Sequence, residues 1–172
     1  HQRFPDRKIS VRNLSWPADE VDLQPRPDNF GDLDQHLHYF KTDIIIAAYG
    51  ANESFDTRPG LAPFESRLGT FLKRLSSQAY NGKSAAKVVL LSPAANEDIA
   101  AVKAGTHNNG ALKKYTEMMR EVAGKLAVGF VDVFTPTLVE FDRPETQNTS
   151  DGHSLNAQGH AFFASAAFHG IF

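Results

Sequence analysis

Cysteine is absent from this chain of 172 residues. Its absence excludes disulfide bonds, thiolate metal sites and a cysteine nucleophile, although it does not fix the cellular compartment. Long apolar runs are missing too, since no stretch approaches the roughly 20 residues that a membrane-spanning helix needs. Basic residues number 18 against 20 acidic residues, so the net charge is -2 and there is no basic excess of the kind that nucleic-acid-binding domains carry. We therefore predict neither a membrane span nor a nucleic-acid partner.

The remaining composition is that of an ordinary globular domain. Hydrophobic residues make up 41% and charged residues 22% of the chain, and there is no internal repeat. A chain of this length buries about two-thirds of its unfolded surface, so residues 1–172 are predicted to form a single domain. The opening residues, HQRFPDRKIS, contain neither a signal peptide nor an initiator methionine, and we expect the chain to be cut from a longer protein.

Four segments have strand patterns. Residues 8–14 (KISVRNL) alternate apolar and polar side chains, as a strand covered mainly on one face does. Residues 42–50 (TDIIIAAYG) and 86–93 (AKVVLLSP) are continuous β-branched and aliphatic runs that end in Gly or Pro, which predicts central parallel strands buried on both faces. Residues 128–136 (VGFVDVFTP) show the same pattern more weakly.

Helical patterns lie between these strands. Two apolar stripes have helical spacing: Phe64, Leu68, Phe71, Leu72 and Leu75, and then Leu112, Tyr115, Met119, Val122 and Leu126. Residues 156–172 are rich in Ala and Phe and predict a closing helix with Asn156 as its N-cap. This alternation predicts an α/β fold with right-handed crossovers, in which ligands bind beyond the carboxyl ends of the strands.

The loop after residues 42–50 contains the first candidate site. Gly50 allows a sharp turn out of a buried strand, and Asn52 then places a carboxamide over the strand end. A carboxamide N–H can stabilise negative charge that develops on oxygen, as in an oxyanion hole. Asn52 can also form an Asx-turn that caps its own backbone, which is the simpler interpretation of this residue alone.

The loop at residues 12–20 (RNLSWPADE) is the second candidate. It follows the neighbouring predicted strand and could direct a backbone N–H at the same oxygen. Pro17 has no N–H, so Ala18 or a neighbour would have to supply the donor. The alternative is a structural turn in which Trp16 packs as a lid on the core.

The third candidate is the segment SDGHSLNAQGH at residues 150–160. Asp151 and His153 fit the orienting acid and the general base of a serine-type hydrolase. The alternative is a plain turn at Asp151 and Gly152, with His153 solvated and Asn156 capping the helix.

Two other polar segments carry weaker signals. His36 and His38 could bind a metal from a strand, but residues 31–40 have a helical pattern that would separate the two side chains by about 200°. Residues 96–110 are expected to be a surface connection or a substrate-rim loop with His107 exposed. We therefore predict no metal ion and no cofactor.

Several segments, taken in order, resemble the successive blocks of SGNH/GDSL-type hydrolases, most closely a bacterial branch common in planctomycetes. They are RNLSWPADE, AAYGANESF, YNGKSAAKVVLLSPAANEDI, YTEMMREVA, FVDVFTPTL and SDGHSLNAQGH. The resemblance implies a flavodoxin-like three-layer α/β/α sandwich with a parallel sheet, and cleavage of esters, thioesters or acetyl groups on carbohydrates. It implies that Asn52 and the Ala18 N–H belong to an oxyanion hole and that Asp151 is the acid of a Ser-His-Asp mechanism. It also favours an extracytoplasmic location.

The chain departs from the family pattern at three places. Ala18 replaces a glycine, and this restricts the loop. Ser154 stands three residues after the acid, where the family has its histidine, and His153 comes one residue early. The Gly-Asp-Ser turn of the nucleophile does not occur, and HQRFPD resembles the end of the helix that follows that turn, so the first strand and the nucleophile are expected upstream of residue 1. Ser54, Ser92 and Ser154 are substitutes that lack a strand-turn-helix elbow.

These observations lead to two hypotheses about function. The first is an ester hydrolase, either an esterase, a lipase-like enzyme or a carbohydrate deacetylase, that acts on a small-molecule or glycan ester. The second is a non-catalytic carbohydrate- or partner-binding module on the same fold. A nucleotide or flavin binder is disfavoured because no glycine-rich phosphate loop follows a strand.

Overall fold

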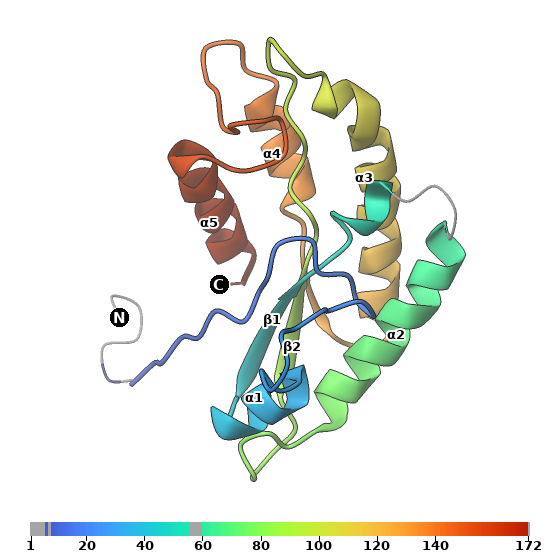
Figure 1. Cartoon of the computed structure of the whole chain (residues 1–172), viewed down its shortest axis with the longest axis vertical. Coiled ribbons are helices and arrows are strands. Elements are labelled where there is room, and N and C mark those ends of the chain that lie inside the picture. Colours follow the sequence, from blue (N-terminus) through green and yellow to red (C-terminus); the bar gives the residue numbers. More distant parts are fainter. Residues whose placement is uncertain (1–5, 7, 56–59, 172) are drawn as a thin grey trace.

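The structure is a computed structural model that describes residues 6, 8–55 and 60–171. Its three parallel strands lie in the order β1-β2-β3, with Ile46 beside Val89 and Leu91 beside Val131. Helices α2 and α3 cover one face of this sheet, and α5 lies on the other side (Figure 1). In chain order the elements are α1 (Leu33–Tyr39), β1 (Ile44–Ala48), η1 (Glu53–Phe55, a 3-10 turn), α2 (Leu61–Ser77), β2 (Lys87–Leu91), α3 (Ala104–Lys125), β3 (Gly129–Val131), α4 (Phe134–Phe141) and α5 (Ala157–Ile171). The predicted α/β class with a parallel sheet is confirmed.

The two amphipathic stripes form most of the core. All five residues of the first stripe are buried on α2, and four of the five in the second stripe are buried on α3. These helices pack together over β1 and β2, because each apolar stripe must be removed from water. The closing helix is also confirmed: the Asn156 Oδ1 accepts from the N–H groups of Gln158 and Gly159 at 2.9 and 3.0 Å and caps α5.

Strand β1 is covered on one face only. Ile45 and Ala47 are buried, but Ile44 and Ile46 are 60% and 57% exposed. The prediction that residues 42–50 are buried on both faces is therefore wrong. The reason is that α5 packs against β3 and leaves the β1 end of that face open.

Residues 8–14 form no strand, and Ile9 and Val11 are exposed. Alternation of apolar and polar residues is a local pattern, whereas a strand also needs a hydrogen-bonded neighbour. In the described part of the chain, these residues pair with none of the three strands. The prediction of a strand at residues 8–14 is therefore wrong.

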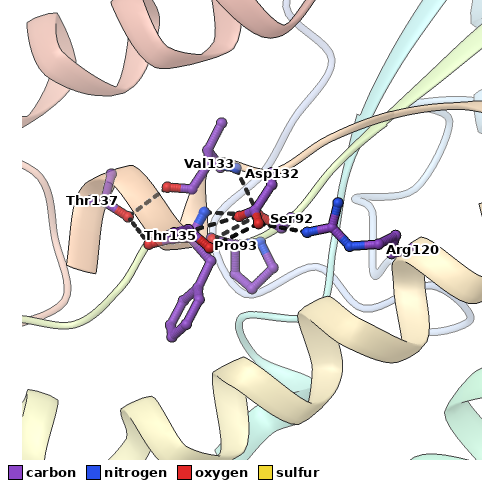
Figure 2. A network of polar contacts seen from close by, with 8 residues as sticks. Ser92, Pro93, Arg120, Asp132, Val133, Thr135 and Thr137 are labelled. Atoms are coloured by element: carbon purple, nitrogen blue, oxygen red, sulfur yellow. Dashed lines mark hydrogen bonds and ion pairs between the residues drawn. The ribbon is translucent and has the colours of Figure 1, made fainter. Parts of the chain in front are cut away.

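The strand predicted at 128–136 ends at Val131, because helix α4 begins at Phe134. Figure 2 shows the reason. The Ser92 Oγ, from the end of β2, accepts from the N–H groups of Val133 and Phe134, both at 2.9 Å. The Asp132 carboxylate accepts from the N–H and the hydroxyl of Thr135. These caps satisfy N–H groups of the first turn and start a helix where the apolar pattern favours a strand.

Helix α3 begins at Ala104, so only the first part of residues 96–110 is a loop. The Asp98 carboxylate accepts from the N–H of Thr106 at 2.9 Å, which secures the first turn of the helix. His107 lies on α3 and is exposed, as predicted. Residues 33–39 are helical, as predicted, so His36 and His38 do not share one face.

Candidate active site

The loop after β1 and the loop before α5 meet at one end of the sheet (Figure 1). Phe55, at the end of η1, packs its ring against the ring of His153, with centroids 5.1 Å apart and planes at 81°. The fold therefore brings two of the three predicted blocks together, although about 100 residues separate them in sequence. This is the edge at which α/β folds bind ligands.

Asn52 joins the third block to this edge. Its Nδ2 donates to the Glu20 Oε1 at 2.7 Å, so the carboxamide reaches the loop at residues 12–20. The backbone of Asn52 is bonded separately, because its carbonyl accepts from the N–H of Phe55 at 3.1 Å. The side chain thus bridges the two loops, and one N–H of its carboxamide is engaged by the Glu20 carboxylate.

A buried carboxylate, Glu53, fixes how these two loops meet. Its side chain accepts from the N–H of Val21 at 3.0 Å and from the N–H of Gly50 at 2.9 Å. Burial raises the pKa of the Glu53 carboxyl above its ordinary value, and the backbone N–H groups oppose that shift. The turn itself requires glycine, since Gly50 has a φ of 93° and a Cβ there would lie 2.9 Å from the Met119 sulfur.

Ala18 occupies a strained conformation in the second loop. Its φ of 63° lies in the left-handed region, which favours the glycine that the family pattern has there. Trp16 does not pack as a lid on the core, because it is 40% exposed and contacts Phe30 and Arg26 at the surface. The lid interpretation is therefore wrong.

The acid of the last block binds its own loop. The Asp151 carboxylate accepts from the N–H of Ser154 at 2.6 Å, from the N–H of His153 at 2.9 Å and from the Ser154 hydroxyl at 2.8 Å. These hydrogen bonds, with that from the Ser154 N–H contributing most, lower the pKa of Asp151 to about 2. Asp151 contacts His153 through the main chain, while the exposed imidazole packs against Phe55. The side chain that the acid holds is thus the one at position 154.

Glu97 anchors the loop at residues 148–152, and no sequence pattern pointed to this role. The side chain follows β2 and is only 3% exposed. It accepts from the N–H of Asn148 at 2.9 Å, from the N–H of Thr149 at 2.7 Å and from the Thr149 hydroxyl. The Glu97 N–H donates to the carbonyl of Gly152 at 2.9 Å. The only sequence signal was its place in a loop at a strand end.

The candidate substitute serines lie in unlike environments. Ser92 is fully buried and caps α4, and Ser54 is buried between the Ala51 carbonyl and the Asn108 side chain. Neither environment exposes a hydroxyl to a substrate. Ser154 is exposed and donates to Asp151.

In the ranges that the structure describes, no group of three or more His, Asp or Glu side chains is arranged to hold a metal ion. No helix in the same ranges is both long and apolar enough to cross a membrane.

The sequence model of the GDSL-like lipase/acylhydrolase family matches residues 2–162 of this chain. The chain belongs to this family. The resemblance expected from the sequence blocks is thus confirmed for the family, whereas the planctomycete branch and the missing nucleophile block stay predictions.

Several solved structures have the same fold as this chain, although their sequences are less than 20% identical to it. Axe2, an acetylxylan esterase from Geobacillus stearothermophilus, is 15% identical with a TM-score of 0.59, over 78% of this chain and 61% of Axe2. The acetyl xylan esterase AlAXEase is 18% identical with a TM-score of 0.63, over 90% of this chain and 77% of AlAXEase. The chain therefore spans less than two thirds of Axe2. No curated protein matches it.

Axe2 has also been solved as catalytic mutants. In these a serine, a histidine or an aspartate is changed to alanine, and the histidine follows the aspartate by three positions.

Proposed function

We propose that this GDSL-family chain forms the oxyanion-binding and acid-base part of an ester hydrolase that uses a Ser-His-Asp mechanism. The observation that carries the proposal is the meeting of three sequence blocks at one end of the sheet, through the Asn52–Glu20 and Phe55–His153 contacts. The substrate class is a small-molecule or glycan ester. The nucleophilic serine is proposed to precede residue 1 in the encoded protein.

Each residue then has a definite role. The Asn52 carboxamide donates an N–H to the negative oxygen of the tetrahedral intermediate, and the Ala18 N–H is the second donor. Gly50 gives the turn that aims Asn52. Asp151 holds the loop, and His153 accepts the proton of the serine after its ring turns away from Phe55.

The test is hydrolysis of p-nitrophenyl acetate by the encoded protein, including the residues that precede His1. Asn52→Ala should lower kcat by about 100-fold to 1,000-fold, because it removes an oxyanion donor. His153→Ala should lower it by a comparable or larger factor, since triad members act as a unit. His169→Ala is the matched control, because this histidine is exposed near the end of α5, 16 positions after His153. Robust turnover that neither Asn52→Ala nor His153→Ala reduces would overturn the proposal.

A second pair of variants locates the base. In Axe2 the histidine stands three positions after the aspartate, and here that position is Ser154, whose hydroxyl already touches the acid. If position 153 is the right place for the base, His153→Ala with Ser154→His should stay below the rate of the natural chain. A rate above that of the natural chain would show that position 154 places the base better and that the natural chain is a weakened enzyme.

The contacts in the last block favour a second candidate function, a non-catalytic carbohydrate- or partner-binding module. Asp151 is occupied by Ser154, and the imidazole of His153 rests on Phe55. This candidate predicts saturable glycan binding without hydrolysis, also when the residues upstream of His1 are present.

A further inference from the structure

We propose that an uncharged carbohydrate chain binds an aromatic surface beside the candidate active site. This surface, the aromatic platform, consists of Trp16, Phe30 and His36. Phe30 and His36 line a cavity of about 330 Å³ between the first loops, α1 and α2, and Trp16 packs against Phe30 beside it. The inference names the substrate class for the proposed ester hydrolase and in that sense rests on the proposed function. Its own evidence is the geometry and charge of this surface.

Phe30 contacts both of the other rings; Trp16 and Phe30 are open to solvent, and His36 is half-buried. Phe30 meets Trp16 edge to face, with centroids 5.3 Å apart, and meets His36 at 4.9 Å. Trp16 is 40% exposed and Phe30 is 38% exposed. A contiguous apolar patch at a surface often marks a binding site, because its exposure to water is unfavourable.

The platform is held in place before any ligand arrives. The Arg26 guanidinium lies 4.9 Å over the Trp16 ring, and it donates two hydrogen bonds to the Asp19 carboxylate at 2.7 and 2.6 Å. The His36 Nε2 lies 2.9 Å from the Phe30 carbonyl oxygen, which ties these two rings together. A site ordered in advance loses less conformational entropy on binding.

The two arginines at the cavity are already paired. Arg26 is held by Asp19, and Arg74 forms an ion pair with Asp34 on α1. An anionic ligand would have to compete with these carboxylates for the guanidinium groups.

The acidic residues at the cavity are engaged as well. Asp22 pairs with Arg67 at 3.3 Å, and Asp32 caps α1 by accepting from the N–H of Gln35 at 2.8 Å. The cavity thus offers aromatic faces and polar groups whose charges are internally balanced. These features favour a ligand that is neutral, bears hydroxyl groups and has apolar faces, as a pyranose ring does.

The platform is continuous with the candidate active site. Trp16 lies in the loop of Ala18 and Glu20, and Glu20 holds Asn52. On the other side, the Gln24 Nε2 donates to the Tyr49 hydroxyl next to β1. A sugar chain that extends from the platform past Trp16 would therefore lead toward Asn52, where an ester on one of its sugars could be placed.

Trp16 is the only tryptophan of the chain, so its fluorescence reports ligands at the platform directly. We would titrate the whole chain with xylohexaose and cellohexaose, and with oligogalacturonate as a charged comparison. We expect a saturable fluorescence change with a neutral hexaose and a Kd that rises about tenfold in Phe30→Ala. Phe30→Leu keeps an apolar side chain without a ring and should weaken binding to a similar degree. Phe168→Ala removes an aromatic ring that is 46% exposed on α5, a helix that contributes no residue to the platform, and it should bind as the natural chain does.

The inference is overturned if neither neutral hexaose gives a saturable change, or if the Kd values of the natural chain and both Phe30 variants are equal. Tighter binding of oligogalacturonate, weakened by salt, would also overturn it, because it would show an anion site. Since binding is measured without turnover, a failure of ester hydrolysis leaves this test intact. Conversely, hydrolysis without glycan binding would refute the platform and retain the proposed function.

Discussion

Replacement of Glu97 by alanine should be among the most damaging single substitutions in this chain. The carboxylate is buried and is the acceptor for two N–H groups and one hydroxyl of residues 148 and 149. Each buried donor left without an acceptor costs about 1–3 kcal/mol, so three donors predict a loss of about 3 kcal/mol or more. That is a large share of the roughly 5–15 kcal/mol by which domains are stable.

The measurement is urea unfolding followed by far-ultraviolet circular dichroism, with linear extrapolation to water. Glu97→Gln keeps the shape and one acceptor oxygen, so it should lose less than Glu97→Ala. The control is the neighbouring Asp98→Ala, which removes an exposed cap of α3 and should cost about 1 kcal/mol. Amide hydrogen exchange should also accelerate at residues 148–152 in the Glu97 variants and not in Asp98→Ala.

The reasoning is refuted if Glu97→Ala costs no more than Asp98→Ala, or if exchange at residues 148–152 is unchanged. Either result would mean that the loop keeps its path without the carboxylate.

Three further outcomes follow from single contacts. Ala18→Gly should stabilise the chain slightly, because relief of about 1–2 kcal/mol of left-handed strain exceeds the added backbone entropy of the unfolded state. Thermal unfolding measures this change in stability, and a clear loss of stability would contradict the prediction. Ser92→Ala should cost about 1–3 kcal/mol, because two N–H groups at the start of α4 lose their acceptor, and it should leave ester hydrolysis unchanged at saturating substrate. The Asp151 pKa of about 2 lies below its ordinary value, so its stabilising contribution is present above about pH 4 and is lost as pH falls through 2. Urea unfolding at pH 5, 3 and 2 should show the gap between the natural chain and Asp151→Ala closing, and a gap that widens on acidification would contradict the assignment.

Local patterns in the sequence predicted the parts of the fold that local physics decides. The stripe from Phe64 to Leu75 predicts α2 because an amphipathic period is visible within one segment. The runs at 42–50 and 86–93 predict β1 and β2 because a continuous β-branched and aliphatic run is also visible within one segment. Residues 8–14 carry an equally clear alternation, but a strand also depends on a partner that the segment itself does not contain.

The residues that shape the candidate site were harder to predict, because their partners are distant and belong to the main chain. Glu53 binds an N–H 32 positions away, and Glu97 binds N–H groups 51 and 52 positions away. Every non-proline residue has such an N–H, so no residue pattern marks the partner. Ser92 caps a helix 41 positions later in the same way, and this ends β3 where the apolar pattern continues.

Because Glu97 bonds mainly to main-chain atoms of the last loop, the path of this loop depends little on which side chains the loop carries. Gly152 contributes a carbonyl to Glu97, and neither position 153 nor position 154 contributes a side chain to that anchor. Residues at these two positions can therefore be exchanged over generations while the loop keeps its course. The backbone of this loop is therefore a support that chains with different side chains at these two positions can share.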